Sequence, residues 1–526
     1  MFCLMPFRRP LPWAAVISAV VLHAAAITLH ADDKLAKRVE EHLALPHFKT
    51  AHWGFLFVDL TTGEVVLERN SEKLFVPAST TKLFSTAAAL DALGADYRFR
   101  TPVYRRGTVD GAGRLDGDLI LFASGDLTFG GRTTEKGEIA FQDSDHIYAN
   151  WAPEARLTTE DPLAGINELA KHVAAAGIRK VNGDVLIDDR MFVHTEGSGS
   201  GPQLVTPIMV NDNVLDFTFE PTEPGQPAKA TWRPQTALFK VEFDVQTVKE
   251  NEPLETTIRA QGDGRIHVTG KIPANKTQVV RVYEVPDPAA FARALLIEAL
   301  RNQGVEVAAE LSQKHPTKSL PERDAYQDLK KVTELVSPPF AENAKLVLKV
   351  SHNLHASTLP LLVAVKHGKR SITDGMKLER EFLAKAGVDV DTISFGGGAG
   401  GARADYVTPA ATVQRLRHMA SRPDFFVYER ALPILGVDGT LAKVVPSDSP
   451  AKGQVQAKTG TLTWDNLLFE RSLCTSKAIA GYLTTAKGKR LAFAAFVNGV
   501  HMKEGITTTR LGSDLGKLCE IVHVER

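Results

Sequence analysis

The chain has 526 residues and equal numbers of basic and acidic side chains, 62 Lys and Arg against 62 Asp and Glu, so its formal net charge is zero. A hydrophobic fraction of 44% and a charged fraction of 24% are typical of a soluble globular protein, here of roughly two to four domains. This composition excludes a disordered chain, a collagen-like repeat and a multi-span membrane protein. Zero net charge gives no electrostatic reason to expect nucleic acid as a partner. Three cysteines are too few for a disulfide scaffold or a cysteine-rich zinc site.

The N-terminal residues have the pattern of a secretory signal peptide. Arg8 and Arg9 form a positively charged start, residues 11–29 are mostly apolar, and a small residue precedes Asp32. We expect residues 1–31 to be removed by cleavage; the alternative is an uncleaved N-terminal anchor helix. Either interpretation predicts an exported protein of the periplasm or cell envelope. Its membrane association would be at most peripheral, or through this uncleaved segment.

The first half of the chain predicts a hairpin, a helix and then a long strand-rich region. Two apolar stretches within 53–70 flank a polar turn, which is typical of a β-hairpin. A helix is expected over 79–93, ended by Gly94. Residues 98–285 are broken by Gly, Pro, Asn and Asp turns. Two further helices are predicted by an N-cap Asp, a following Pro and a closing Gly: Asp161-Pro162 to Gly177 and Asp287-Pro288 to Gly304.

The C-terminal part predicts a second hairpin, formed by 478–485 and 490–498. The near-continuous apolarity of 491–497 indicates a strand at the centre of a sheet. A last helix is expected over 507–522. Strands near both ends of the chain predict one sheet assembled from both termini and interrupted by a large insert. Outside the cytoplasm Cys474 and Cys519 could pair; two inert buried thiols are the alternative.

Three short motifs occur in a fixed order and carry the candidate chemistry. Ser79-Thr80-Thr81-Lys82 opens the first helix. Ser351-His352-Asn353 precedes an apolar helical stretch over 354–365, which Pro360 would break or kink. Lys458-Thr459-Gly460-Thr461 precedes the C-terminal hairpin. These are the S-x-x-K, S-x-N and K-T-G motifs of active-site serine enzymes that recognise penicillin.

The spacing of the first motif has a physical reason. Residues three apart share one face of a helix, so the amine of Lys82 can reach Ser79 Oγ. A lysine acts as a base only when neutral, and burial in a cleft lowers its pKa. The N–H groups at the start of the helix can stabilise an oxyanion. A second serine can relay a proton, an asparagine can hold a substrate amide, and a lysine with hydroxyl groups can bind a carboxylate.

Each motif alone is a weak signal. A second S-x-x-K, Ser449 to Lys452, leads into the K-T-G strand and is discounted. Ser79 could be only a helix-capping serine, and Lys458 only a solvated strand lysine, but the ordered triple favours a serine acyl-transfer site. His352 and His355 have i, i+3 spacing without an H-E-x-x-H pattern or an evident third ligand. We therefore expect no metal and no cofactor.

The chain resembles the D-alanyl-D-alanine carboxypeptidase/endopeptidase family of class C low-molecular-mass penicillin-binding proteins (serine peptidase family S13). The likeness includes the three motifs and several turn sequences, among them Leu115-Asp116-Gly117-Asp118-Leu119, Val210-Asn211-Asp212-Asn213 and Gly436-Val437-Asp438-Gly439. The resemblance implies an α/β penicillin-binding (DD-peptidase/β-lactamase-like) fold, an antiparallel sheet with flanking helices, split by a β-rich insert. We expect 32–97 and 286–526 to form the catalytic domain and 98–285 the insert.

The resemblance also implies the role of each motif residue. It makes Ser79 the acylated nucleophile, Lys82 the general base and Ser351 the proton relay. Asn353 would hold the penultimate peptide carbonyl. The remaining implied roles are carboxylate binding by Lys458 and Thr459, and an oxyanion hole from the backbone N–H groups of Ser79 and Thr461. The implied partners are a peptidoglycan stem peptide ending in D-Ala-D-Ala and β-lactams as covalent inhibitors.

Two segments depart from the family pattern. The stretch Gly397-Gly398-Ala399-Gly400-Gly401-Ala402 lacks an Asp and two Ser that the family usually has, which predicts a looser loop. Residues 465–477 are extra and would reshape the cleft wall beside the carboxylate-binding strand. Two alternatives to the peptidase therefore stay open: a β-lactamase or esterase on the same core, and a catalytically silent wall-binding protein.

Overall fold

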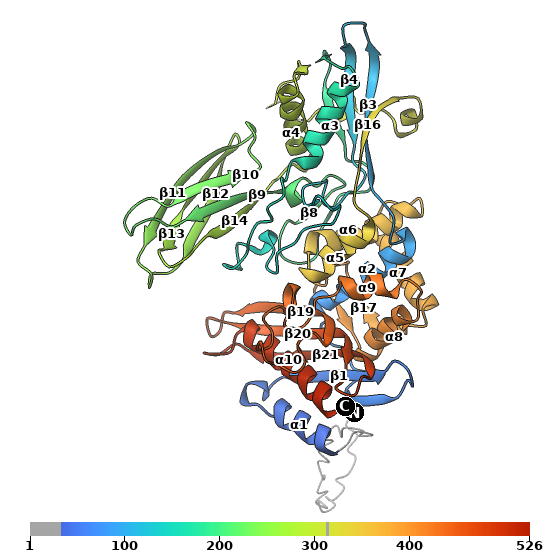
Figure 1. Cartoon of the computed structure of the whole chain (residues 1–526), viewed down its shortest axis with the longest axis vertical. Helices are drawn as coiled ribbons and strands as arrows, with labels where there is room; N and C mark the ends of the chain where they lie inside the picture. Colours follow the sequence, from blue (N-terminus) through green and yellow to red (C-terminus); the bar gives the residue numbers. More distant parts are fainter. Residues whose placement is uncertain (1–32, 312–314) are drawn as a thin grey trace, which may run out of the picture.

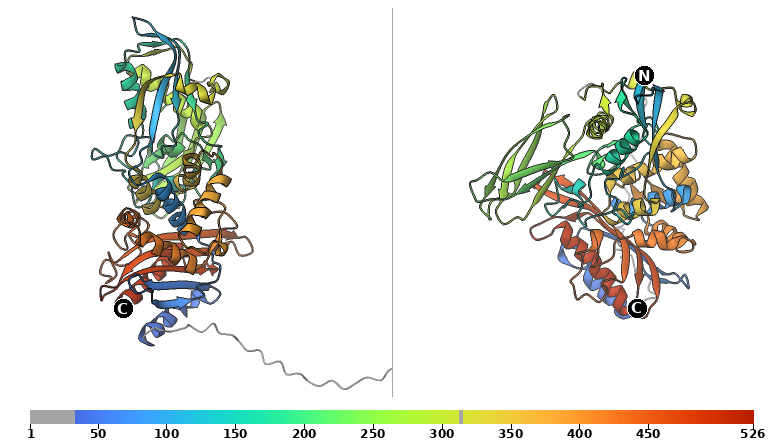
Figure 2. Two further views of the ribbon diagram at one scale, coloured as in Figure 1. Left: turned by 90° about the vertical axis from the view of Figure 1, so that its right-hand side faces the viewer. Right: turned by 45° about the horizontal axis from the view of Figure 1, so that its top comes forward.

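The structure is a computed structural model that describes residues 33–311 and 315–526. The expected signal peptide, 1–31, lies outside the described residues. Within them, no helix is long and apolar enough to cross a membrane. The molecule is elongated, with a sheet-and-helix core at one end and the β-rich insert at the other (Figures 1 and 2).

The core is built on one sheet whose strands come from both ends of the chain. Its strands run in the order β19-β20-β21-β1-β2, and the short β22 pairs with β20. Neighbouring strands are antiparallel. The bounds are β1 His52–Asp59, β2 Val65–Arg69, β19 Val455–Asn466, β20 Arg471–Thr484, β21 Arg490–Asn498 and β22 Val500–His501. Both predicted hairpins and the sheet shared by the two termini are thereby confirmed.

Helices cover both faces of this sheet, which explains its apolar central strand. In β21, Phe493 and Ala495 face one helical layer while Ala494 and Phe496 face the other. The first layer contains α1 (Asp33–Leu43) and α10 (Thr508–Glu525), which lie side by side in Figure 1. The second layer comprises α2 (Lys82–Leu93), α5 (Phe340–Lys349), α6 (Asn353–Lys366), α7 (Ile372–Lys385), α8 (Pro409–Ala420) and α9 (Phe425–Ala431). A strand buried on both faces reads as a continuous apolar run.

The insert contains three larger sheets and two helices. The largest sheet has the order β15-β5-β4-β3-β16 with β6 on β4; the other two are β10-β9-β14 and β11-β13-β12. The last of these projects to one side of the molecule (Figure 1). The strands are β3 Arg100–Val109, β4 Arg114–Phe122, β5 Lys180–Val181, β6 Val185–Asp188, β9 Val214–Glu220, β10 Lys229–Arg233, β11 Lys240–Val248, β12 Glu255–Gly262, β13 Arg265–Pro273, β14 Val279–Glu284, β15 Glu306–Val307 and β16 Lys330–Val336. The helices are α3 Ala164–Ala175 and α4 Pro288–Asn302.

The insert ends later than the expected boundary at residue 285. Strand β16 pairs with β3, β15 pairs with β5, and α4 packs against α3. The chain returns to the core only at α5. Residues 286–336 therefore pack with the insert, because strand pairings between distant parts of the sequence decide their position.

Two helix predictions also need correction. Helix α4 begins at Pro288 with Asp287 as its N-cap, as predicted, but α3 begins at Ala164. Asp161 instead accepts a hydrogen bond from the Leu163 N–H at 2.9 Å, in the turn before α3. Helix α6 runs on through Pro360 without ending there. The glycine-rich stretch 397–402, here called the glycine loop, packs against the turn of α6 that precedes Pro360. A Cβ on Gly398 would lie 2.1 Å from the Ala356 carbonyl oxygen.

Candidate active site

The nucleophile candidate lies in a tight turn at the start of α2. Ser79 is in a 3₁₀ helix, Ala78–Thr81, that leads directly into α2. The preceding residue, Ala78, has φ 47°, a left-handed conformation that is costly for a residue with a side chain. Lys82 Nζ donates a hydrogen bond to Ser79 Oγ at 2.8 Å. The predicted reach across one helical turn is therefore present.

The Lys82 amine is buried among neutral acceptors. Besides Ser79 Oγ it donates to Asn353 Oδ1 at 2.7 Å and to the Ala399 carbonyl at 2.9 Å. Burial lowers the pKa of Lys82 well below its usual value, the Lys458 cation lowers it further, and the Asp405 carboxylate opposes both. Charge in this site is therefore destabilised, and the amine is suited to accept a proton during catalysis.

The second motif brings Asn353 to the Lys82 amine and Ser351 to the Lys458 amine. Ser351 has φ 65°, and its hydroxyl accepts a hydrogen bond from Lys458 Nζ at 2.9 Å. Lys458 also donates to the Thr459 carbonyl at 2.7 Å. Burial, followed by repulsion from a neighbouring lysine, lowers the pKa of Lys458 to about 7. Asn353 connects Lys82 to the insert, because its Nδ2 donates to the Ser200 carbonyl at 2.9 Å.

These elements surround a cleft of about 690 Å³. Five of the seven predicted site residues line it: Ser79, Ser351, Asn353, Thr459 and Thr461. The other two, Lys82 and Lys458, lie beneath its surface and are hydrogen-bonded to the lining serines. The structure thus brings all seven predicted residues into one site.

The sequence analysis missed two residues of this cleft. Tyr148, from the insert, lines the cleft and donates a hydrogen bond from its hydroxyl to the Ser351 carbonyl. Lys477, from β20, also lines it and donates to Thr461 Oγ1 at 2.8 Å. Neither lies in a motif. Only the strand register, which pairs Lys477 with Thr461, identifies it as a residue of the cleft.

The glycine loop is held more firmly than predicted. Asp405 accepts hydrogen bonds from the Gly396 and Ala402 N–H groups at 2.7 and 2.8 Å. The Gly398 carbonyl accepts one from Ser85 Oγ at 2.8 Å. Backbone groups and Asp405 therefore fix the loop without the side chains that are absent from it, so the expectation of a loose loop is wrong.

Residues 465–477, which the sequence analysis expects to be extra, form the outer end of the β19–β20 hairpin. The strands remain paired out to Asn466 and Arg471. The tip, Leu467-Leu468-Phe469, is exposed. The segment lengthens two strands of the sheet, and its last residue, Lys477, lines the cleft. Cys474 is buried within it and Cys519 is buried in α10; the two are free thiols, not a disulfide.

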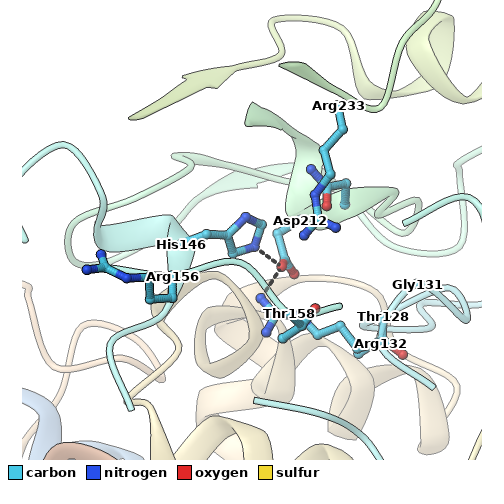
Figure 3. Close-up of a pocket in the computed structure, with 9 residues that line it drawn as sticks. Thr128, Gly131, Arg132, His146, Arg156, Thr158, Asp212 and Arg233 are labelled. Atoms are coloured by element: carbon cyan, nitrogen blue, oxygen red, sulfur yellow. Dashed lines mark hydrogen bonds and ion pairs between the residues drawn. The ribbon is translucent and has the colours of Figure 1, made fainter. Parts of the chain in front are cut away.

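A buried ion network in the insert contacts the second motif; Figure 3 shows its members Arg132, His146 and Asp212. Asp212 Oδ2 accepts hydrogen bonds from Arg132 at 2.7 Å and from His146 at 2.9 Å. Its other oxygen, Oδ1, lies 2.6 Å from His355 Nε2 and 3.3 Å from His352 Nε2. His355 lies in the first turn of α6, and His352 is the N-cap residue of this helix, between Ser351 and Asn353. The insert therefore holds the start of the helix that carries the second motif.

Asp212 is also the third potential metal ligand that the sequence did not reveal. The His352 and His355 rings are stacked, with centroids 3.6 Å apart and planes 16° apart. Both Nε2 atoms lie within 3.3 Å of Asp212 Oδ1, so the three side chains meet around one carboxylate oxygen. Burial lowers the pKa of His352 to about 4, and carboxylates raise that of His146 to about 10 against the effect of burial. The geometry is that of a charge-balanced hydrogen-bond network.

Comparisons with known proteins agree with this geometry. The model of the D-Ala-D-Ala carboxypeptidase 3 (S13) family matches residues 35–513. The chain is 28% identical over 490 residues to a D-alanyl-D-alanine carboxypeptidase of an Actinomadura species, covering 89% of this chain and 81% of that protein. It is 25% identical over 476 residues to D-alanyl-D-alanine carboxypeptidase DacB of Haemophilus influenzae, covering 85% of each. The crystal structure of penicillin binding protein 4 (dacB) from H. influenzae matches with a TM-score of 0.67 and 22% identity, over 91% of this chain and 98% of that one.

Proposed function

The chain belongs to the D-Ala-D-Ala carboxypeptidase 3 (S13) family and is a serine-type, penicillin-binding D-Ala-D-Ala peptidase, and we propose that Ser79 forms its acyl-enzyme. The observation that carries the assignment is the buried Lys82 amine, 2.8 Å from Ser79 Oγ. The substrate is a peptidoglycan stem peptide ending in D-Ala-D-Ala. β-Lactams acylate the same serine.

Acylation begins with Lys82 in its neutral form, in which two N–H groups donate to Asn353 and Ala399, the lone pair accepts a hydrogen bond from the Ser79 hydroxyl, and the amine takes the proton of Ser79. Oγ then attacks the carbonyl carbon of the penultimate D-Ala, and the new oxyanion is stabilised by the backbone N–H groups of Ser79 and Thr461. The proton taken up by Lys82 passes through the hydroxyl of Ser351, held by Lys458, to the nitrogen of the departing D-Ala, which leaves Lys82 neutral and Ser351 protonated. The C–N bond breaks, and the peptide remains on Ser79 as an ester.

Substrate binding uses the two sides of the cleft. The Asn353 side chain holds the peptide carbonyl next to the reacting bond. The hydroxyl groups of Thr459 and Thr461 bind the C-terminal carboxylate, and Lys458 acts mainly through Ser351, because its amine is buried against that hydroxyl. Water then hydrolyses the ester and regenerates the enzyme.

The test is release of D-alanine from a peptide ending in D-Ala-D-Ala. Ser79→Ala should abolish release and leave the melting temperature nearly unchanged. The matched control is Ser449→Ala in the second S-x-x-K sequence, because Ser449 Oγ bonds Glu520, outside the cleft; it should retain wild-type release. Undiminished release by Ser79→Ala would refute the assignment. Rapid destruction of benzylpenicillin without peptide cleavage would favour the β-lactamase alternative, and inertness towards both substrates the silent wall-binding protein.

We place the reaction in the cell envelope, where peptidoglycan is found. Removal of residues 1–31 during export predicts a mature protein whose N-terminus is Asp32. Edman sequencing of the protein recovered from cells tests this start. Recovery of the intact N-terminus in the membrane fraction would favour the anchor alternative.

A further inference from the structure

A third amine lies where the substrate carboxylate is expected. In the antiparallel register of β19 and β20, Lys477 is opposite Thr461 and Ile479 is opposite Thr459. Directly paired residues project to the same face of a sheet, and so do residues two apart along a strand. Thr459, Thr461 and Lys477 therefore share one face, and all three line the cleft.

The Lys477 amine is held in place at this edge of the cleft. It donates to Thr461 Oγ1 at 2.8 Å. On its other side is α10, where a Cβ on Gly512 would lie 3.6 Å from Nζ. The missing side chain at Gly512 leaves room for the amine between the strand and the helix.

Lys458 is poorly placed to supply the charge that a carboxylate needs. Its side chain is 0% exposed, and its amine is bonded to Ser351 Oγ and the Thr459 carbonyl. It belongs to the side of β19 that faces Ser351, whereas Thr459 and Thr461 project from the opposite face. A substrate carboxylate bound by the two threonines would therefore meet Lys477 first.

We propose that Lys477 is the residue whose charge recognises the free C-terminal carboxylate of the substrate, together with the hydroxyl groups of Thr459 and Thr461. This inference rests on the proposed function and deepens it. An amine and two hydroxyl groups offer a carboxylate several hydrogen bonds, of which the one from the cation is the strongest. The enzyme then selects peptides with a free carboxylate after the scissile bond over those in which it is amidated.

The charges around Lys477 fit this role. Within 33–311 and 315–526 it makes no ion pair with an acidic side chain of the protein. The neighbouring titratable groups are the Lys458 cation and the Cys474 thiol, and Asp143, Glu154 and Lys443 line other parts of the cleft. Burial lowers the pKa of Lys477 to about 8. An incoming carboxylate would supply the missing counter-charge and stabilise the protonated amine.

The experiment compares two peptides that differ only at the C-terminus: one ends in D-Ala-D-Ala and the other in its carboxamide. kcat and KM are measured for the wild type, Lys477→Met, Lys477→Arg and the control Lys487→Met, whose lysine lies in the exposed β20–β21 turn. We expect Lys477→Met to raise KM for the carboxylate peptide roughly 10- to 100-fold, the usual effect of losing a charged hydrogen bond, and to leave the carboxamide nearly unaffected. Lys477→Arg should restore most of the discrimination, and Lys487→Met should match the wild type.

A second readout uses β-lactams and reports on Ser79 directly. Acylation of Ser79 by benzylpenicillin and by its methyl ester is followed by intact-protein mass spectrometry in the same variants. We expect Lys477→Met to slow acylation by the free acid selectively. If Lys477→Met still prefers the free carboxylate as strongly as the wild type in both assays, and Ser79 is acylated normally, the role of Lys477 is overturned and the proposed function stands. Absence of any Ser79 adduct in the wild type would overturn the proposed function, and the role of Lys477 with it.

Discussion

Replacing Asp212 with alanine tests whether the insert positions the catalytic groups. The carboxylate is 3% exposed and accepts hydrogen bonds from Arg132, His146 and His355 at 2.6–2.9 Å. Without this carboxylate the buried cations lose part of their compensating negative charge. Such a loss typically lowers the free energy of unfolding by about 3–5 kcal/mol. At roughly 2–4 °C per kcal/mol for a domain of this size, the melting temperature should fall by about 6–20 °C.

The same change should slow the reaction at Ser79. His355 lies in the first turn of α6, so its release from Asp212 loosens the helix start that carries Ser351 and Asn353. A displacement of about 1 Å of such groups can reduce the rate about 10²-fold. The assay is the rate of acylation by a fluorescent penicillin, measured below the melting temperature of the variant.

Two further variants make this prediction decisive. Asp110→Ala removes an exposed carboxylate that pairs with Arg114 at 2.7 Å; it should leave both the melting temperature and the acylation rate nearly unchanged. Asp212→Asn keeps the size of the side chain and removes only its charge, so it serves if the alanine variant does not fold. Wild-type acylation by folded Asp212→Asn and Asp212→Ala would refute the positioning role of the insert.

Three other expectations follow from the cleft. Lys82→Met should slow acylation by a fluorescent penicillin about 10²- to 10⁴-fold through loss of the general base, whereas the exposed-lysine control Lys73→Met should not; equal rates would place the base elsewhere. The Lys477 amine is charged below about pH 8 and neutral above it, so KM for carboxylate peptides should rise as the pH passes 8, and a flat KM in steady-state assays up to pH 10 would contradict this. Gly398→Ala would place a Cβ 2.1 Å from a backbone carbonyl oxygen of α6, so acylation by the fluorescent penicillin should fall at least about tenfold, while Gly111→Ala, with open space around it, should be neutral; a wild-type rate for Gly398→Ala would contradict this.

Local patterns predicted much of the core, because short-range chemistry determines them. The three motifs, both hairpins and the helix capped by Asp287 follow from residues close together in the sequence. The local sequence did not predict that α6 continues through Pro360, because the packing of this helix against the glycine loop decides it. The start of α3 was misplaced because Asp161 bonds within a turn rather than capping the helix.

Contacts between distant parts of the sequence could not be predicted from the motifs. Strand β16 joins β3 across more than two hundred residues, which moved the end of the insert. Asp212, in a short 3₁₀ helix of the insert, meets His355 of α6, and Lys477 meets Thr461 only through the register of β19 and β20. These long-range contacts supply the support behind the second motif and the additional charge in the cleft.

The most direct measurement is mass spectrometry of the mature protein after incubation with benzylpenicillin, followed by peptide mapping. The structure predicts a single penicilloyl adduct on the peptide containing Ser79, absent from Ser79→Ala and present in Ser449→Ala. An adduct on a different residue, or one that persists in Ser79→Ala, would contradict the assignment of Ser79 as the nucleophile.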